Sequence, residues 1–144
     1  MEQAELKEKI LAFLKTHKKA VLSTVGDDDH PTSSLMLYVA DDSLTVYFGT
    51  RKSFAKYKIM SRHPYVSLSV IEESIDPLKT VEIRGKIEFI PDDKTKETLA
   101  AFQAENTCKF YVCEADDFVM FKVVPTFVRW LDATSGELTL TSLT

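Results

Sequence analysis

The residues best suited to hold an anion lie in one short segment of an acidic chain. From residue 43 to residue 71 there is no Asp or Glu, although the chain has 22 of them. The basic residues inside this stretch are Arg51, Lys52, Lys56, Lys58 and Arg62. Local charge of one sign against a background of the other is typical of an anion-binding site. The stretch also reads as a strand, a turn and a helix start, and helix N-terminal amides beside Lys and Arg can bind phosphate.

Two interpretations of this basic segment stay open from the residues alone. It could be a solvated helix face that balances the acidity of the molecule, as most charge runs are. Alternatively, it could be a phosphate pocket made by Thr50 and Lys56, with Arg51 or Lys52 assisting. The strand–turn–helix setting favours the pocket, but the anion affinity of helix N-termini is general and does not decide between the two.

Other kinds of chemical site find little support in the sequence. The three histidines, His17, His30 and His63, are scattered, and none stands at metal-ligand spacing from a thiol or carboxylate, so we expect no metal. The four glycines form neither a nucleotide-binding loop nor a nucleophile elbow. Cys108 and Cys113 are five residues apart, which fits neither a redox pair nor a zinc site, and we expect reduced thiols.

The size and charge of the chain limit its class. A chain of 144 residues with 44% hydrophobic and 28% charged residues fits one domain, residues 1–144. A net charge of −4 argues against nucleic acid as a partner. No apolar run is long enough to span a bilayer, and the acidic N-terminus lacks a signal-peptide core, so we expect a cytoplasmic protein that does not bind membranes.

Hydrophobic periodicity predicts three helices and about eight strands. The helices are expected at residues 4–17, 53–62 and 91–104. The strands are expected at residues 20–25, 32–40, 44–48, 65–71, 81–89, 118–124, 126–132 and 137–141. Gly85, in the middle of the clearest alternating strand, suggests a bulge or bend, and Trp130 is expected to be a buried residue of a barrel strand. Many short strands in succession favour a mainly β, α+β fold with an antiparallel barrel.

Several motifs recur in a characteristic order along the chain. Thr50 is followed six residues later by Lys56, and Pro64-Tyr65-Val66-Ser67-Leu68 begins eight residues after that lysine. A Gly-containing strand, residues 81–87, and the closing segment 121–132 come later. In this order and spacing the chain resembles the pyridoxamine-5′-phosphate-oxidase-like, FMN-binding family. The resemblance implies a Greek-key antiparallel split β-barrel and a homodimer with two flavins at its interface.

The resemblance also implies which residues bind the cofactor, FMN. Those expected along the flavin ring and its ribityl tail are Ser34, Leu35, Met36 and Leu37. Those expected at the phosphate are Gly49, Thr50 and, as the cation, Lys56. Thr80 falls where the family often uses a polar side chain from the neighbouring subunit. Tyr38, Tyr47 and Trp130 are candidates to border the substrate, and no catalytic acid or base is identified.

The chain departs from the family pattern in the phosphate motif. The family's Ser-Arg-Lys reads Phe54-Ala55-Lys56 here, and Ser34 replaces a second Arg. We therefore expect weaker FMN binding unless Arg51, Lys52 or Ser53 compensates.

The function implied is that of an FMN-dependent oxidoreductase acting on an unidentified small molecule. The chain ends before the C-terminal segment that grips vitamin B6 in the true oxidases, so pyridoxamine phosphate is not the expected substrate. The alternatives are a non-catalytic binder of FMN, haem or the deazaflavin F420, and a barrel that has lost its cofactor.

Overall fold

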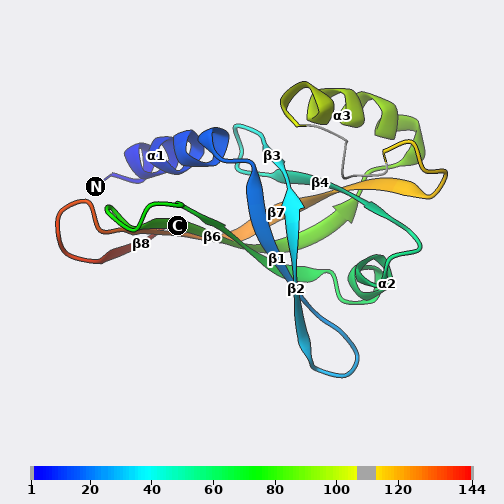
Figure 1. Cartoon of the computed structure of the whole chain (residues 1–144), viewed down its shortest axis with the longest axis horizontal. Helices are drawn as coiled ribbons and strands as arrows, with labels where there is room; N and C mark the ends of the chain where they lie inside the picture. The colour runs from blue at the N-terminus through cyan, green and yellow to red at the C-terminus, as the bar shows by residue number, and fades with distance from the viewer. Residues whose placement is uncertain (1, 107–112, 144) are drawn as a thin grey trace.

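Eight antiparallel strands form one curled sheet in the computed structural model, which describes residues 2–106 and 113–143 (Figure 1). The strands are β1 (Lys19–Val25), β2 (Pro31–Leu37), β3 (Val39–Ala40), β4 (Val46–Arg51), β5 (Tyr65–Ile71), β6 (Lys79–Phe89), β7 (Phe118–Asp132) and β8 (Thr139–Leu143). The helices are α1 (Gln3–Thr16), α2 (Ala55–Arg62) and α3 (Asp92–Glu105). Helix α1 contacts β3 and β8, α2 contacts β1, and α3 contacts β7.

The order of the strands leaves one seam in the barrel. The sheet runs β2-β1-β5-β6-β7-β4-β3, with β8 added on β7. Strand β2 is thus at one end of the sheet, and β4 and β3 are at the other. The sheet curls until β2 contacts β4, but the described residues form no backbone ladder between them. This open seam confirms the predicted split β-barrel and the mainly β, α+β class.

The main core lies inside the curled sheet and beneath α1. Strand β6 alternates as the sequence predicts, with Val81, Ile83 and Ile87 buried and the charged residues between them more exposed. Helix α1 buries Leu6 and Ile10 completely, and each such side chain is worth about 1.5–3 kcal/mol. The prediction that Trp130 is buried is confirmed.

The last long strand corrects the prediction of two strands separated by Pro125. Strand β7 is continuous through that proline, which pairs with Gly85 where the register between β6 and β7 shifts, leaving Thr126 of β7 as the extra residue. A Cβ on Gly85 would lie 2.3 Å from the carbonyl oxygen of Val124, so only glycine allows the two strands to approach this closely. The predicted bulge at Gly85 is therefore confirmed, and its irregularity accommodates the missing N–H of the proline.

Two further sequence predictions change in the structure. The strand expected at residues 32–40 is interrupted at Tyr38, whose hydroxyl donates to the carbonyl oxygen of Leu14 at 2.6 Å. The prediction of reduced thiols is wrong for Cys113, which is buried and disulfide-bonded, while Cys108 lies outside the described residues. Among the described helices, none has both the length and the apolar character that a membrane span requires.

Candidate functional site

The predicted phosphate residues lie where β4 ends and α2 begins, beside the open seam. Helix α2 starts at Ala55 with no acidic residue in its first turn and no side-chain cap. The backbone amides of Ala55 and Lys56 have no hydrogen-bond partner in the described part of the chain. Because the first amides of a helix carry partial positive charge, this terminus favours an anion.

The Lys56 ammonium group has no carboxylate partner in the part of the chain that the structure describes. The group lies 3.0 Å from the sulphur of Met36 on β2, and the side chain is only partly exposed. It forms no ion pair with any described residue. Burial lowers the pKa of Lys56 from its ordinary value. A thioether is a weak acceptor, so the desolvated charge is poorly compensated and would gain from a negatively charged ligand.

Thr50 carries a second polar group without a partner. Its side chain is 3% exposed, and its hydroxyl oxygen has no hydrogen-bond partner among residues 2–106 and 113–143. Thr50 alternates with the fully buried Phe48, so both side chains face the inside of the curled sheet. A buried, unsatisfied hydroxyl costs about 1–3 kcal/mol, which a ligand oxygen would recover.

Asp117 organises the turn between Thr50 and Lys56, and the sequence analysis missed it. Its carboxylate accepts hydrogen bonds from the Arg51 guanidinium at 2.7 Å and from the Ser53 amide at 3.0 Å. Hydrogen bonds from Ser53, and then from Arg51, lower the pKa of Asp117 to about 2. The carboxylate therefore stays ionised and fixes the turn. Asp117 lies in a stretch of sequence that shows no periodicity. It comes close to Arg51 only because Arg51 on β4 pairs with Phe118, the residue that follows Asp117.

The other residues predicted at the phosphate differ in their surroundings. The Arg51 guanidinium is engaged by Asp117 and lies over the Phe54 ring at 5.7 Å. The Lys52 side chain is exposed, and the described residues offer it no ion pair. At Gly49, a Cβ would lie 2.6 Å from the Phe118 ring, so the glycine lets that ring pack on β4.

The predicted flavin-ring residues on β2 divide between the two faces of the sheet. Met36 is 3% exposed and faces inward, while Leu35 is 68% exposed and faces outward. Ser34 and Leu37 are half-buried. Strand β2 is hydrogen-bonded only to β1 among the described strands, so its second edge faces the seam.

Thr80 is not brought to the phosphate residues within one chain. It pairs with Ile71 on β5, and the strand registers place both on the outer face that also carries Leu35. Of the three aromatic substrate candidates, Tyr38 and Trp130 are buried at 2% and 5% exposure, whereas Tyr47 lines a pocket beneath α3.

Known proteins share both the sequence pattern and the fold. The family model described as pyridoxamine 5′-phosphate oxidase matches residues 6–129. A Listeria innocua protein, provisionally named a pyridoxamine 5′-phosphate oxidase, is 29% identical with a TM-score of 0.70, over 90% of this chain and 98% of that one. The chain has no match among curated proteins.

Two more distant structures show the fold alone. General stress protein 26 of Bacillus anthracis is 23% identical with a TM-score of 0.69, over 88% of this chain and 93% of that one. A haem-binding protein of Mycobacterium smegmatis is 19% identical with a TM-score of 0.72, over 99% of this chain and 58% of that one.

Proposed function

The chain belongs to the pyridoxamine 5′-phosphate oxidase family, and from that premise we propose that it is an FMN-binding oxidoreductase acting on a small molecule. The observation that carries the proposal is the half-buried Lys56 ammonium, which no described carboxylate neutralises. Lys56 lies in the first turn of α2, close to the amides at the start of that helix. Thr50, with its unsatisfied hydroxyl, lies near the end of β4, the strand that precedes α2. A phosphate group supplies the negative charge and the acceptor oxygens that all of these donors lack.

In this proposal the chain binds and orients the cofactor. Thr50, Lys56 and the α2 amides hold the phosphate, while Asp117 keeps their turn in place. The edge of β2, with Ser34 and Met36, would contact the rest of the cofactor. Bound FMN would supply hydride or electron transfer, and the surrounding protein would exclude water from the ring.

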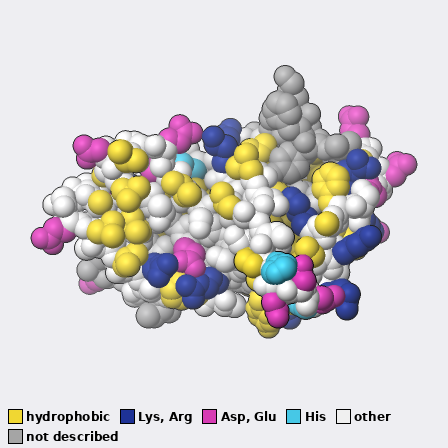
Figure 2. All heavy atoms as spheres, turned by 60° about the horizontal axis from the view of Figure 1, so that its bottom comes forward, with side chains coloured by type: hydrophobic (Ala, Val, Ile, Leu, Met, Phe, Trp, Pro, Cys, Tyr) yellow, Lys and Arg dark blue, Asp and Glu magenta, His cyan; other side chains and the backbone are white. Residues whose placement is uncertain are grey.

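We also propose that the protein is a homodimer with the flavin at its interface. The outer face of the sheet carries large hydrophobic side chains that are well exposed in the single chain, among them Leu35 at 68%, Tyr65 at 68% and Ile71 at 51%. Hydrophobic side chains also gather at the left of Figure 2, over the end of the sheet where β8 lies. Contiguous exposed apolar surface is typical of an interface. A second copy here would bring its Thr80 toward the first chain's β2. Light scattering that gives a monomer would contradict this part of the proposal.

Haem is the alternative for which a structural neighbour, the Mycobacterium smegmatis protein, gives a specific reason. The three histidines do not favour it. His17 stacks on Phe13, while ring nitrogens of His30 and His63 contact the carboxylates of Asp28 and Asp27 in the β1–β2 turn. None is therefore presented as a free axial ligand. F420 and a barrel without cofactor remain alternatives with no observation in their favour.

The deciding experiment compares FMN with riboflavin. Purified full-length protein is titrated with each, and the quenching of flavin fluorescence is followed. We expect FMN to bind much more tightly than riboflavin, because only FMN carries the phosphate. Equal affinities would remove the phosphate site from the proposal.

The absorption spectrum of the purified protein separates the alternatives. Flavin bands support the proposal, a Soret band supports the haem binder, and the absence of both, with no FMN binding on titration, supports the barrel without cofactor. The cytoplasmic location expected from the sequence remains part of the proposal.

A further inference from the structure

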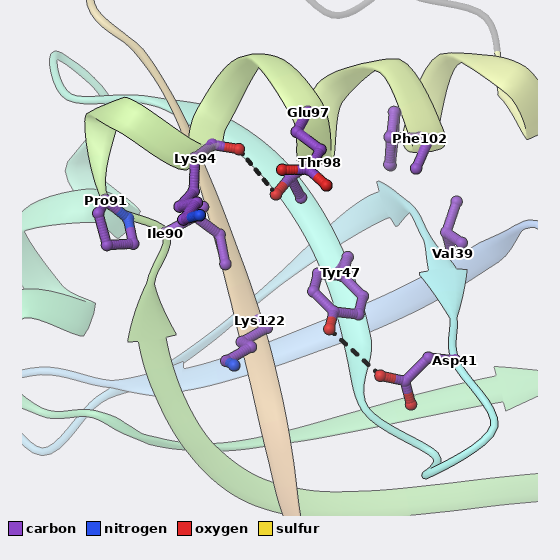
Figure 3. A pocket seen from close by; sticks show the side chains of 11 residues that line it. Val39, Asp41, Tyr47, Ile90, Pro91, Lys94, Glu97, Thr98, Phe102 and Lys122 are labelled. Atoms are coloured by element: carbon purple, nitrogen blue, oxygen red, sulfur yellow. Dashed lines mark hydrogen bonds between the residues drawn. The ribbon is translucent and has the colours of Figure 1, made fainter.

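A pocket lies beneath α3, and none of the predicted cofactor residues lines it. Its volume is about 530 Å³, within the range of about 300–1,000 Å³ that small-molecule sites occupy. Its walls come from β3, β4, the connection between β6 and α3, helix α3 and β7 (Figure 3). The residues that line it are Val39, Asp41, Tyr47, Ile90, Pro91, Lys94, Glu97, Thr98, Ala101, Phe102 and Lys122.

The floor of this pocket is apolar and packed against a small core. Ile90 and Phe102 are 8% and 1% exposed, and together with Met120 they form a small core separate from the main one. Val39 and the ring of Tyr47 pack against that core and are only partly buried. An apolar ligand body would remove their remaining surface from water, which is the main source of affinity in such sites.

Most polar groups of the pocket are already satisfied by the protein. One oxygen of Asp41 accepts hydrogen bonds from the amides of Ser43 and Thr45, and the other accepts one from the Tyr47 hydroxyl at 3.2 Å. Burial, and then the charge of Asp41, raise the pKa of Tyr47, so its hydroxyl stays a donor to that carboxylate. The Thr98 hydroxyl donates to the carbonyl oxygen of Lys94. Asp41 is therefore a fixed part of the wall.

The groups left for a ligand are two ammonium groups. Lys94 makes no ion pair within the described residues. The Lys122 ammonium lies 3.6 Å from the Glu88 carboxylate, too far for a strong hydrogen bond, so it retains donors for another partner. The one uncommitted carboxylate at the rim is that of Glu97, which is exposed on α3. The lining therefore holds two ammonium groups and two carboxylates, because hydrogen bonds from neutral donors do not cancel the charge of Asp41. With no excess of positive charge, the pocket favours a ligand with a single negative charge over a phosphate dianion.

The side chains that line the pocket are spread along the underside of α3, on both sides of Tyr47. Figure 3 shows Tyr47 under α3, with Phe102 and Val39 on one side and Lys94 and Ile90 on the other. Lys122 lies on the side of Lys94, and Asp41 lies on the side of Val39. The two ammonium groups are thus at one end of the pocket, and the other end combines apolar side chains with the hydrogen-bonded Asp41 carboxylate. From this geometry we propose that the pocket binds a small carboxylic acid with an apolar body, with its carboxylate at Lys94 and Lys122 and its body against Phe102 and Val39.

Octanoate is a probe with this chemistry, and nuclear magnetic resonance of the ¹⁵N-labelled full-length chain can locate it. We expect saturable shifts with one ligand per chain, centred on the amides of Tyr47, Thr98 and Phe102. Octanamide, which has the same shape without the charge, should bind about tenfold more weakly, because it lacks the charge-assisted contact. Shifts that do not saturate, or equal binding of the two probes, would overturn the proposal.

Two pairs of variants test the position of the ligand. Lys94→Gln should weaken octanoate binding about tenfold, while Lys96→Gln, an exposed lysine of the same helix outside the pocket, should not. Ala101→Phe should block the pocket, and Ala100→Phe should not. Ala100 and Ala101 are both exposed on α3, so neither substitution threatens the fold. An octanoate affinity unchanged by Ala101→Phe would place the ligand elsewhere.

Discussion

Neutralising Lys56 should weaken FMN binding by a predictable amount. Two unit charges about 4 Å apart attract by about 4 kcal/mol at the effective dielectric constant of about 20 found near protein surfaces. Because the Lys56 side chain is half exposed, solvent screening reduces this to roughly 2 kcal/mol, or about thirtyfold in affinity. Lys56→Met keeps the length and apolar stem of the side chain and removes only the charge. Lys56→Glu also adds repulsion of similar size, so we expect a loss of about a thousandfold.

The assay is a fluorescence titration with FMN at fixed ionic strength, with thermal unfolding as the check on folding. Lys58 is the matched control, because it lies on the same helix and is exposed. Lys58→Met and Lys58→Glu should change FMN affinity little. Lys56→Met should leave the free protein at least as stable, since it removes a charge whose pKa burial already lowers. If Lys56→Glu binds FMN as tightly as the unaltered protein, the assignment of Lys56 to the phosphate is wrong.

Three further predictions concern pH and the backbone. Burial lowers the pKa of Lys56 below 10.5, so FMN affinity should fall as the pH rises through that lowered value, and Lys56→Met should show no such fall. The pKa of Asp117 is lowered from 3.8 to about 2, so the ionised carboxylate stabilises the fold fully at any pH above 3.8. Asp117→Asn should therefore lower the melting temperature at neutral pH. The difference between the two proteins should vanish as the pH falls through about 2. Gly85→Ala forces a Cβ within 2.3 Å of a carbonyl oxygen and should lower the free energy of unfolding by about 1–3 kcal/mol, measured by chemical denaturation. Gly26→Ala, where the nearest atom is 3.6 Å away, should cost far less, and equal losses at the two glycines would contradict the steric argument.

The strands and their faces were largely predictable from the sequence, because alternation is a local property. The period of two in β6 and the apolar stripe of α1 both appear in the structure where the sequence predicts them. The main error was at Pro125, where a missing N–H normally ends a strand. The structure avoids that outcome because Gly85, forty residues earlier in the chain, provides an irregularity opposite it.

The candidate site was predictable only in part, for a related reason. The spacing of Thr50 and Lys56 is visible in the chain, but their lack of partners is not. Met36 meets Lys56 across 20 residues of sequence, and Asp117 meets Arg51 across 66. No local pattern encodes either contact, since both depend on how the ends of the sheet curl toward each other.

The sequence by itself determined the kinds of groups present: a basic stretch without carboxylates, alternating strands and a lysine at the start of a helix. Only the tertiary structure decided which of these groups are left without a partner. Arg51 is neutralised by Asp117, whereas Lys56 is partly desolvated against a sulphur atom. Hydrogen bonding and desolvation depend on the neighbours that folding supplies, and the capacity to bind an anion lies in the charge that folding leaves uncompensated.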